Sequence, residues 1–224
     1  MKIKLIILLV ITSVAFFACK SSKTGEVSPK DGQIEKAVEP VKAPTLAFDP
    51  TKLPEEPIFN INTTEGIIKI KLYKETPLHK ANFIKLASER FYDNIIFHRV
   101  IKNFMIQVGD PLTKDTTALV EKYGTGGPGY TIPAEILSQF KHKKGALAAA
   151  RRPDTSNPNK ESSGSQFYIV QDVAACSQLD GDYTIFGETV GGLDIIDKIA
   201  TVPTGKKNFP ITPIRIISIT PVTE

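Results

Sequence analysis

One arginine and one glutamine stand eight residues apart, on two short apolar runs that the pattern predicts to be neighbouring strands. Arg99 lies in the run Ile95 to Val100, and Gln107 lies in the run Met105 to Val108. An arginine stays charged and presents a rigid fork of hydrogen-bond donors. Aimed at an atom that gains a lone pair only in the transition state, such a donor lowers a reaction barrier. Taken alone, an arginine in this position is more often a solvated charge.

Three segments in a fixed order give the arginine its context. They are Phe97-His98-Arg99 with Phe104-Met105-Ile106-Gln107-Val108-Gly109-Asp110, then Gly164-Ser165-Gln166-Phe167-Tyr168-Ile169, then Leu179-Asp180-Gly181 with Phe186-Gly187. Together they resemble the cyclophilin family of peptidyl-prolyl cis-trans isomerases. The resemblance covers about residues 58–220, and the combination of segments is far more specific than any one of them.

The resemblance implies an enzyme that rotates X-Pro peptide bonds in proline-containing polypeptides. Such a bond resists rotation because the nitrogen shares its lone pair with the carbonyl group, and uncatalysed isomerisation takes tens of seconds or longer. Twisting the bond localises the lone pair on the prolyl nitrogen, where a cationic donor can bond to it. This chemistry needs no nucleophile, metal or cofactor, and we expect none.

The resemblance also implies roles for ten residues. Arg99 is the catalytic donor, and Gln107 orients it and bonds the substrate backbone. Ala150 and Arg151 hold the substrate through main-chain groups, and Gln166 also binds it. An apolar slot for the prolyl ring is expected from five side chains: Phe104, Met105, Phe167, Leu179 and Tyr183.

Four features depart from the family pattern. Tyr183 stands where many members carry histidine, which keeps a flat apolar wall. Arg151 replaces an asparagine, and its charge is expected to favour acidic neighbours in substrates. Residues 152–163 form a longer loop near the expected site. Gln178 stands where many eukaryotic members carry the tryptophan that contacts cyclosporin, and this chain has no tryptophan. We therefore expect weak or no cyclosporin binding.

Short strands dominate the predicted domain. The pattern predicts strands at 58–62, 67–72, 95–100, 105–108, 146–150, 167–170, 184–186 and 214–219, with a hairpin turn at 64–66. A helix is expected to begin at Thr76-Pro77, with threonine as the cap, and a second to span 193–200. The expected fold is mainly β, a closed eight-stranded antiparallel barrel with two capping helices.

The N-terminal segment has the pattern of a bacterial lipoprotein. Residues 1–18 combine Lys2 and Lys4 with an apolar run too short to span a bilayer comfortably, which predicts a signal peptide. Cys19 is the expected lipidated residue. Residues 19–57 are then predicted to be a disordered tether rich in Lys, Glu, Pro and Ser, and the isomerase domain is expected at 58–224. We expect a lipid-anchored protein of the cell envelope, periplasmic or on the outer membrane. A plain secretory signal is the alternative.

Several other activities are disfavoured. The net charge of +4 is too small to argue for nucleic-acid binding. Residues 124–129 match G-x-G-x-x-G, but no strand and helix flank them as a dinucleotide site requires. His79, His98 and His142 lack metal-ligand spacing, so no metal is expected. Cys176 is expected to be a small buried residue rather than a nucleophile.

Two other functions remain open at this stage. The chain could be a non-catalytic module that binds proline peptides or acts as a chaperone on the same fold, as Arg151, Gln178 and the long loop would allow. A purely structural envelope lipoprotein is the third hypothesis, and it leaves the matching site residues unexplained. An intact fold with an inert Arg99 would favour either alternative.

Overall fold

The first two strands form the hairpin that the sequence predicts. Strand β1 (Ile58–Thr63) alternates partly exposed with buried residues, and β2 (Gly66–Leu72) pairs with it antiparallel. Thr63 Oγ1 donates to the Gly66 carbonyl at 2.6 Å and accepts from its amide at 3.1 Å. Gly66 has a φ of +141°, a conformation that L side chains rarely adopt. The turn chemistry therefore fixes the register of the pair.

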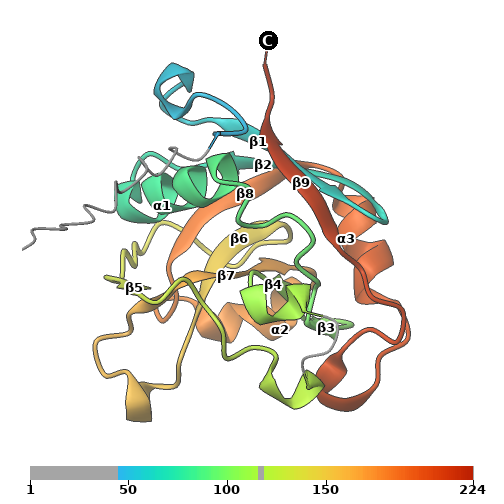
Figure 1. The fold of residues 1–224 in the computed structure, drawn as a ribbon. Helices are drawn as coiled ribbons and strands as arrows, with labels where there is room; N and C mark the ends of the chain where they lie inside the picture. The colour runs from blue at the N-terminus through green and yellow to red at the C-terminus, as the bar shows by residue number, and fades with distance from the viewer. Residues whose placement is uncertain (1–44, 116–118, 224) are drawn as a thin grey trace, which may run out of the picture. The chain divides into compact units, whose positions relative to one another are not determined.

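Eight strands form one curled antiparallel sheet in the order β3-β4-β7-β6-β8-β2-β1-β9, and a short ninth strand, β5, pairs with β7 (Figure 1). The remaining strands are β3 (Arg99–Ile101), β4 (Met105–Val108), β5 (Thr131–Ile132), β6 (Ala146–Arg151), β7 (Ser162–Val170), β8 (Ile185–Gly191) and β9 (Ile216–Pro221). This confirms the predicted mainly β architecture with eight antiparallel strands in the main path.

Main-chain hydrogen bonds join the segments just before β3 and β9, which are the two ends of the strand order. The Phe97 amide donates to the Ile214 carbonyl at 2.9 Å, and the Ile216 amide donates to the Ile95 carbonyl at 2.9 Å. The predicted strand at 95–100 is therefore divided. Its first half pairs with the chain before β9, and only its end enters β3.

Helices α1 (Pro77–Ser88) and α3 (Leu193–Ala200) match the two predicted helices, and a short α2 (Val173–Cys176) is additional. Pro77 occupies the first turn of α1 as expected, but Thr76 makes no capping hydrogen bond with its side chain. Glu135 supplies the cap instead, because its carboxylate accepts from the amides of Leu78 at 3.0 Å and His79 at 2.9 Å.

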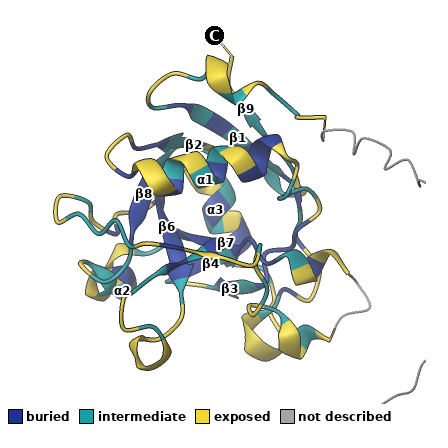
Figure 2. Ribbon diagram, turned by 60° about the vertical axis from the view of Figure 1, so that its left-hand side comes forward, coloured by how far each residue is buried: buried dark blue, intermediate teal, exposed yellow. Residues whose placement is uncertain are grey.

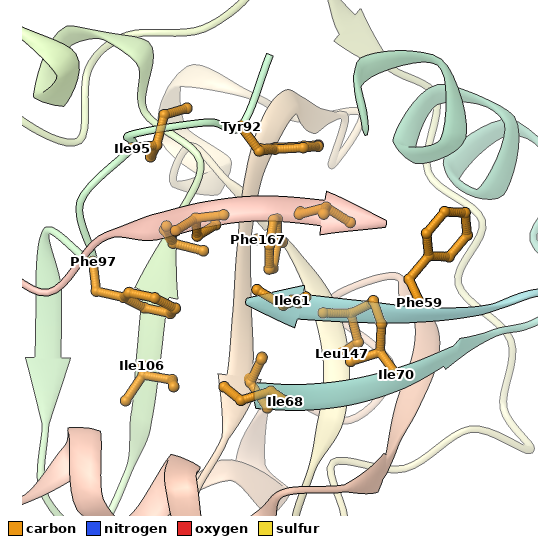
Figure 3. Close-up of a cluster of buried hydrophobic side chains, with 14 of the residues drawn as sticks. Phe59, Ile61, Ile68, Ile70, Tyr92, Ile95, Phe97, Ile106, Leu147 and Phe167 are labelled. Carbon is orange, nitrogen blue, oxygen red and sulfur yellow. The ribbon is translucent and has the colours of Figure 1, made fainter. Parts of the chain in front are cut away.

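Two hydrophobic clusters lie on opposite faces of β4, β6 and β7. The larger cluster contains the buried residues of β1, β2, β9, α1 and α3, and Figure 3 shows its centre around Phe167 and Ile61. The smaller cluster contains Met105, Ala148 and Tyr168 from the same three strands. Figure 2 shows these strands as the dark blue centre of the sheet. Because successive side chains of a strand point to opposite faces of the sheet, neighbouring residues belong to different clusters.

The structure, a computed structural model, describes residues 45–115 and 119–223. The predicted signal peptide, the predicted lipidation site Cys19 and the tether as far as residue 44 lie outside the described residues. Within the described part, no helix is both long enough and apolar enough to cross a membrane.

The expected tether ends earlier than the sequence predicts. Residues 45–57 pack on the domain and include the 3-10 turn η1 (Pro50–Lys52). The Ala47 amide donates to the Ser88 carbonyl at 2.7 Å, and the Phe48 ring lies 5.6 Å from the Phe59 ring. Phe48 and Leu53 of this proline-rich segment pack against the main core.

Candidate active site

Strand pairing sets Arg99 directly beside Gln107. The two residues are register partners in the β3–β4 ladder, so their side chains leave the same face of the sheet. An Arg99 Nη atom donates to Gln107 Oε1 at 3.4 Å, and the guanidinium carbon lies 5.7 Å from the centre of the Phe104 ring. Partial burial lowers the pKa of Arg99, although an arginine remains protonated in proteins. The site thus holds a half-buried cation with free donors.

A relay of amides fixes Gln107 in turn. Gln107 Nε2 donates to Gln166 Oε1 at 3.1 Å. Gln166 Nε2 donates to the carbonyls of Gly124 at 3.1 Å and Gly126 at 2.8 Å. Each amide has one accepting and one donating end, so every bond donates in the same direction, from Arg99 toward the carbonyls of the glycine loop (residues 124–129). The relay therefore positions the Gln107 oxygen that accepts from the guanidinium.

The glycine loop is itself anchored by the buried carboxylate of Asp110. Asp110 accepts from the amides of Gly124 at 2.5 Å, Gly126 at 3.1 Å and Leu112 at 2.8 Å. The G-x-G-x-x-G match of residues 124–129 therefore serves the relay with its main-chain groups. Asp110 is a positioning residue that the sequence analysis quoted within a motif but did not assign.

Four of the five predicted slot residues lie together. Met105 is buried in the smaller cluster, and Phe104, Leu179 and Tyr183 pack against that cluster while remaining partly exposed. The Cys176 thiol donates to the Phe104 carbonyl at 3.3 Å, and burial raises the thiol pKa to about 12. Cys176 is thus the small buried residue that the sequence predicts.

Phe167 lies apart from this group. Its ring packs against Phe83 and Tyr92, with centroids 5.6 Å apart in each pair, inside the larger cluster. Tyr168, the next residue, faces the slot residues instead, because successive side chains of β7 point to opposite faces. Its ring lies 5.9 Å from the Tyr183 ring. The motif locates the strand, whereas only the structure shows which of its two aromatic residues faces the site.

The hydroxyl of Tyr168 forms a hydrogen bond with a buried histidine. His142 Nε2 lies 2.8 Å from the Tyr168 hydroxyl, and His142 Nδ1 lies 2.7 Å from Asp180 Oδ1. Burial lowers the pKa of His142 and raises that of Tyr168 well above its usual value. The neutral imidazole therefore accepts from the hydroxyl and donates to the carboxylate. Because Asp180 follows Leu179, these hydrogen bonds connect Tyr168 to the segment that carries Leu179.

The side chain of Arg151 is paired within the protein. Its Nε donates to the Asp182 carbonyl at 2.8 Å, its guanidinium carbon lies 4.5 Å from the centre of the Tyr183 ring, and Asp154 forms an ion pair with it. Only 5% of the side chain is exposed. The charge that was expected to favour acidic neighbours in substrates is therefore already paired with Asp154. Ala150, beside it, is nearly buried.

A groove of about 890 Å³ adjoins these residues. Gln107, Gln166, Ala150 and Arg151 line it together with the glycine loop and residues of the long loop: Gly124, Thr125, Gly126, Gly127, Gly129, Tyr130, Thr131, Arg152, Ser156, Asn157, Glu161 and Ser163. The long loop is therefore a wall of the groove, as its sequence position predicts. Gln178, by contrast, is exposed on a short turn.

Fold and site together define a curled antiparallel β-sheet protein with a half-buried arginine between an apolar cluster and a polar groove. Residues 58–221 match the family model described as "Cyclophilin type peptidyl-prolyl cis-trans isomerase/CLD". The chain belongs to this family.

Relatives at moderate identity support the assignment. The "Peptidyl-prolyl cis-trans isomerase" of Acinetobacter baylyi is 38% identical, and the match covers 71% of this chain and 82% of that protein. The "Peptidyl-prolyl cis-trans isomerase 9" of Schizosaccharomyces pombe is 40% identical over 71% of this chain, but the match spans only 24% of that protein. In a relative from Rhizopus delemar the match spans 29% of the protein.

A crystal structure of a cyclophilin-type isomerase from Cryptosporidium parvum has a TM-score of 0.65 and 31% sequence identity to this chain. The match covers 75% of this chain and 99% of that one. The same protein was also crystallised in the presence of the dipeptide Ala-Pro.

Proposed function

We propose that the chain catalyses cis-trans isomerisation of X-Pro bonds in proline-containing polypeptides. The observation that carries the proposal is the guanidinium of Arg99, oriented by Gln107 and flanked by the apolar cluster of Phe104 and Met105. The prolyl ring enters between Phe104, Met105, Tyr168 and Leu179. The substrate backbone lies along the groove beside Gln107 and Ala150.

The chemistry follows from the change in the prolyl nitrogen during rotation. In the planar bond its lone pair is delocalised and accepts no hydrogen bond. As the bond twists, the lone pair becomes an acceptor, and a donor of Arg99 not used by Gln107 bonds to it. Because this bond exists only in the twisted state, it lowers the barrier rather than stabilising the bound substrate.

Isomerisation of a proline tetrapeptide by the full chain tests this proposal. The Arg99→Ala variant should lower kcat/KM by about a hundredfold or more, as removal of a transition-state donor does elsewhere. Arg99→Lys should recover little, since an ammonium lacks the planar fork. Unchanged circular dichroism would show that the fold is intact. A fully active Arg99→Ala variant would contradict the role of Arg99. A natural chain that binds proline peptides without isomerising them, and binds them equally well as Arg99→Ala, would instead favour a non-catalytic module.

The envelope location is a further part of the proposal. A positively charged start, an apolar run and Ala18-Cys19 support processing before Cys19 and attachment of lipid there. The substrates would then be proline-containing proteins of the cell envelope. Mass spectrometry of the mature N-terminus should find acylated Cys19, and Cys19→Ala should release the protein from membranes. A mature N-terminus elsewhere would leave a plain secretory signal.

Weak cyclosporin binding is expected from the exposed Gln178, which offers an amide where an indole would give a large flat surface. Calorimetry should find no tight binding to the natural chain and a clear gain in affinity for Gln178→Trp. Tight binding by the natural chain would contradict this expectation.

A further inference from the structure

The two most exposed large apolar side chains of the described residues lie together, away from the groove. Ile211 is 69% exposed and Leu119 is 62% exposed. Both border a hollow of about 420 Å³ between the 3-10 turns η3 (Val120–Lys122) and η6 (Lys206–Asn208). In Figure 1 these are the light green turn and the red segment at the lower right. No residue lines both this hollow and the groove.

The hollow is held in shape by contacts between its two sides. Lys207 Nζ donates to the Glu121 carbonyl at 2.5 Å, and the Tyr123 ring lies 5.4 Å from the Phe209 ring. Lys207 and Asn208 have φ values of +56° and +59°, a left-handed conformation that is costly for residues other than glycine. The apolar side chains are therefore presented on a formed surface rather than by a loose loop.

Three lysines of the turns η3 and η6 lie in or next to the hollow. Lys122, Lys206 and Lys207 are all exposed, and within the described residues none of them forms an ion pair with a carboxylate. Glu121 is the single acidic residue among those that line the hollow. Several lysines elsewhere on the surface are paired with carboxylates, among them Lys143, Lys144, Lys160 and Lys198.

We propose that this basic apolar hollow, lined by Leu119, Val120, Lys206 and Ile211 and adjoined by Lys122 and Lys207 of the same two turns, docks on an anionic lipid bilayer. The apolar side chains would enter the interface while the ammonium groups remain among the phosphates, where each lysine adds attraction. Lysine is depleted from protein–protein interfaces, so this combination fits a lipid surface better than a protein partner. The docking is separate from any anchor at Cys19, because it involves only residues of the folded domain.

The absence of tryptophan makes a site-specific test simple. The full chain would be prepared as Ile211→Trp and, as a matched control, as Leu78→Trp. Leu78 is 49% exposed at the start of α1, and the nearby Lys74 is paired with Glu55 at 3.6 Å. Each variant is mixed with vesicles of phosphatidylcholine, with or without phosphatidylglycerol, that carry brominated acyl chains. Circular dichroism and isomerase activity check the fold.

Bromine should quench the emission of Ile211→Trp strongly in the phosphatidylglycerol vesicles and weakly in pure phosphatidylcholine. Leu78→Trp should show little quenching in either. Adding Lys206→Glu and Lys207→Glu to the Ile211→Trp chain should lower the quenching constant by about tenfold, since two attractive charges become repulsive. This readout holds whether or not the N-terminus is anchored, because it reports contact at position 211.

Three results would overturn the proposal. Equal quenching of the two tryptophan variants would mean contact without a preferred face. Absence of quenching in anionic vesicles would mean that the hollow does not meet lipid. An emission shift of Ile211→Trp that rises with protein concentration and needs no vesicles would assign the hollow to a second copy of the chain.

Discussion

Arg99 has a neutral acceptor at 3.4 Å in Gln107, and among the described residues it forms no ion pair with a carboxylate. That choice of partner matters for the reaction. A neutral amide orients the guanidinium while leaving its charge uncompensated. A carboxylate would bind it more strongly and compete with the prolyl nitrogen for its donors. The electrostatic pull on the twisted bond therefore depends on an amide rather than an acid at position 107.

The Gln107→Glu variant tests this point with almost no change in shape. We expect kcat/KM to fall by about tenfold or more, because a charge-assisted pair between the introduced carboxylate and Arg99 replaces a neutral bond. The variant also loses the bond that Gln107 Nε2 donates to Gln166 Oε1, so we expect a small loss of thermal stability. The tetrapeptide assay measures the first quantity and calorimetry the second. An unchanged rate would show that the charge of Arg99 is not what lowers the barrier.

His98, next to Arg99, predicts an acid-sensitive fold. The imidazole is 5% exposed, and burial lowers its pKa from 6.5 to about 4. As pH falls below about 6.5, the unfolded chain therefore takes up the proton before the folded chain does. Stability is full above this range and declines until pH reaches about 4. The loss amounts to about 3 kcal/mol for this one residue.

Urea unfolding of the natural chain and of His98→Gln between pH 7 and pH 4 measures this contribution. Burial also lowers the pKa of His79 and of His142, so both proteins should lose stability in acid. The natural chain should lose more, by the share that belongs to His98. Parallel curves for the two proteins would show that His98 is protonated as easily in the folded state as in the unfolded state.

At the level of elements, the glycine loop helps to position Arg99 through Gln166 and Gln107, and the loop itself is in close contact with Asp110. A Cβ atom at Gly126 would lie 2.2 Å from Asp110 Oδ1 and 2.8 Å from Leu112 Cγ. At Gly127 the nearest atom would be Ser165 Oγ at 4.0 Å. Gly126→Ala must therefore displace the loop, whereas Gly127→Ala fits. The two variants differ by one position and share the same added methyl group.

We expect Gly126→Ala to lower kcat/KM by about tenfold, because displacing the Gly126 carbonyl frees Gln166 and, through Gln107, Arg99. Gly127→Ala should be close to the natural chain in rate. Chemical shifts of the Arg99 guanidinium in NMR spectra should move in the first variant only. Equal rates for the two variants would contradict the relay.

Some elements could be predicted from the sequence and others could not, for physical reasons. The β1–β2 hairpin was predictable because alternation and turn chemistry are local properties. The cap of α1 was not, since Glu135 lies far from Leu78 in sequence and no local pattern connects them. Likewise, Phe167 and Tyr168 are both aromatic residues of one strand. Composition alone does not show which of the two side chains points to which face of the sheet. Only packing against the larger cluster decides which of them faces the slot.

The long loop shows the same limit at the site. Its length and polarity correctly predicted a surface loop near the groove. The pairing of Arg151 with Asp154, and of Lys160 with Asp182, depends on how the loop folds back on the turn before Tyr183. Those contacts turn a charge that looked available to substrates into a structural one. Residue type alone therefore did not predict the pairing of the Arg151 side chain, whereas position within the motif predicted that Ala150 and Arg151 lie beside the groove.

For the whole molecule, the ordered domain is larger than the family match. The match begins at residue 58, but Phe48 and Leu53 already pack against the main core. The Phe48 ring contacts Phe59, and Phe59 in turn lies 5.9 Å from the Phe83 ring of α1. The segment before β1 thus covers the side of the core where β1 and α1 meet.

Phe48→Ala should therefore lower the free energy of unfolding by about 1–3 kcal/mol, because it exposes apolar surface on Phe59 and removes a ring contact. Leu46→Ala is the matched control, since that side chain is 44% exposed and its loss should be nearly neutral. Urea denaturation of the full chain measures both. Isomerase activity should be unchanged in either variant under native conditions, because neither residue lines the groove. If the two variants were equally stable, residues 45–57 would contribute nothing to the fold, and the domain would begin at β1 as the sequence analysis expected.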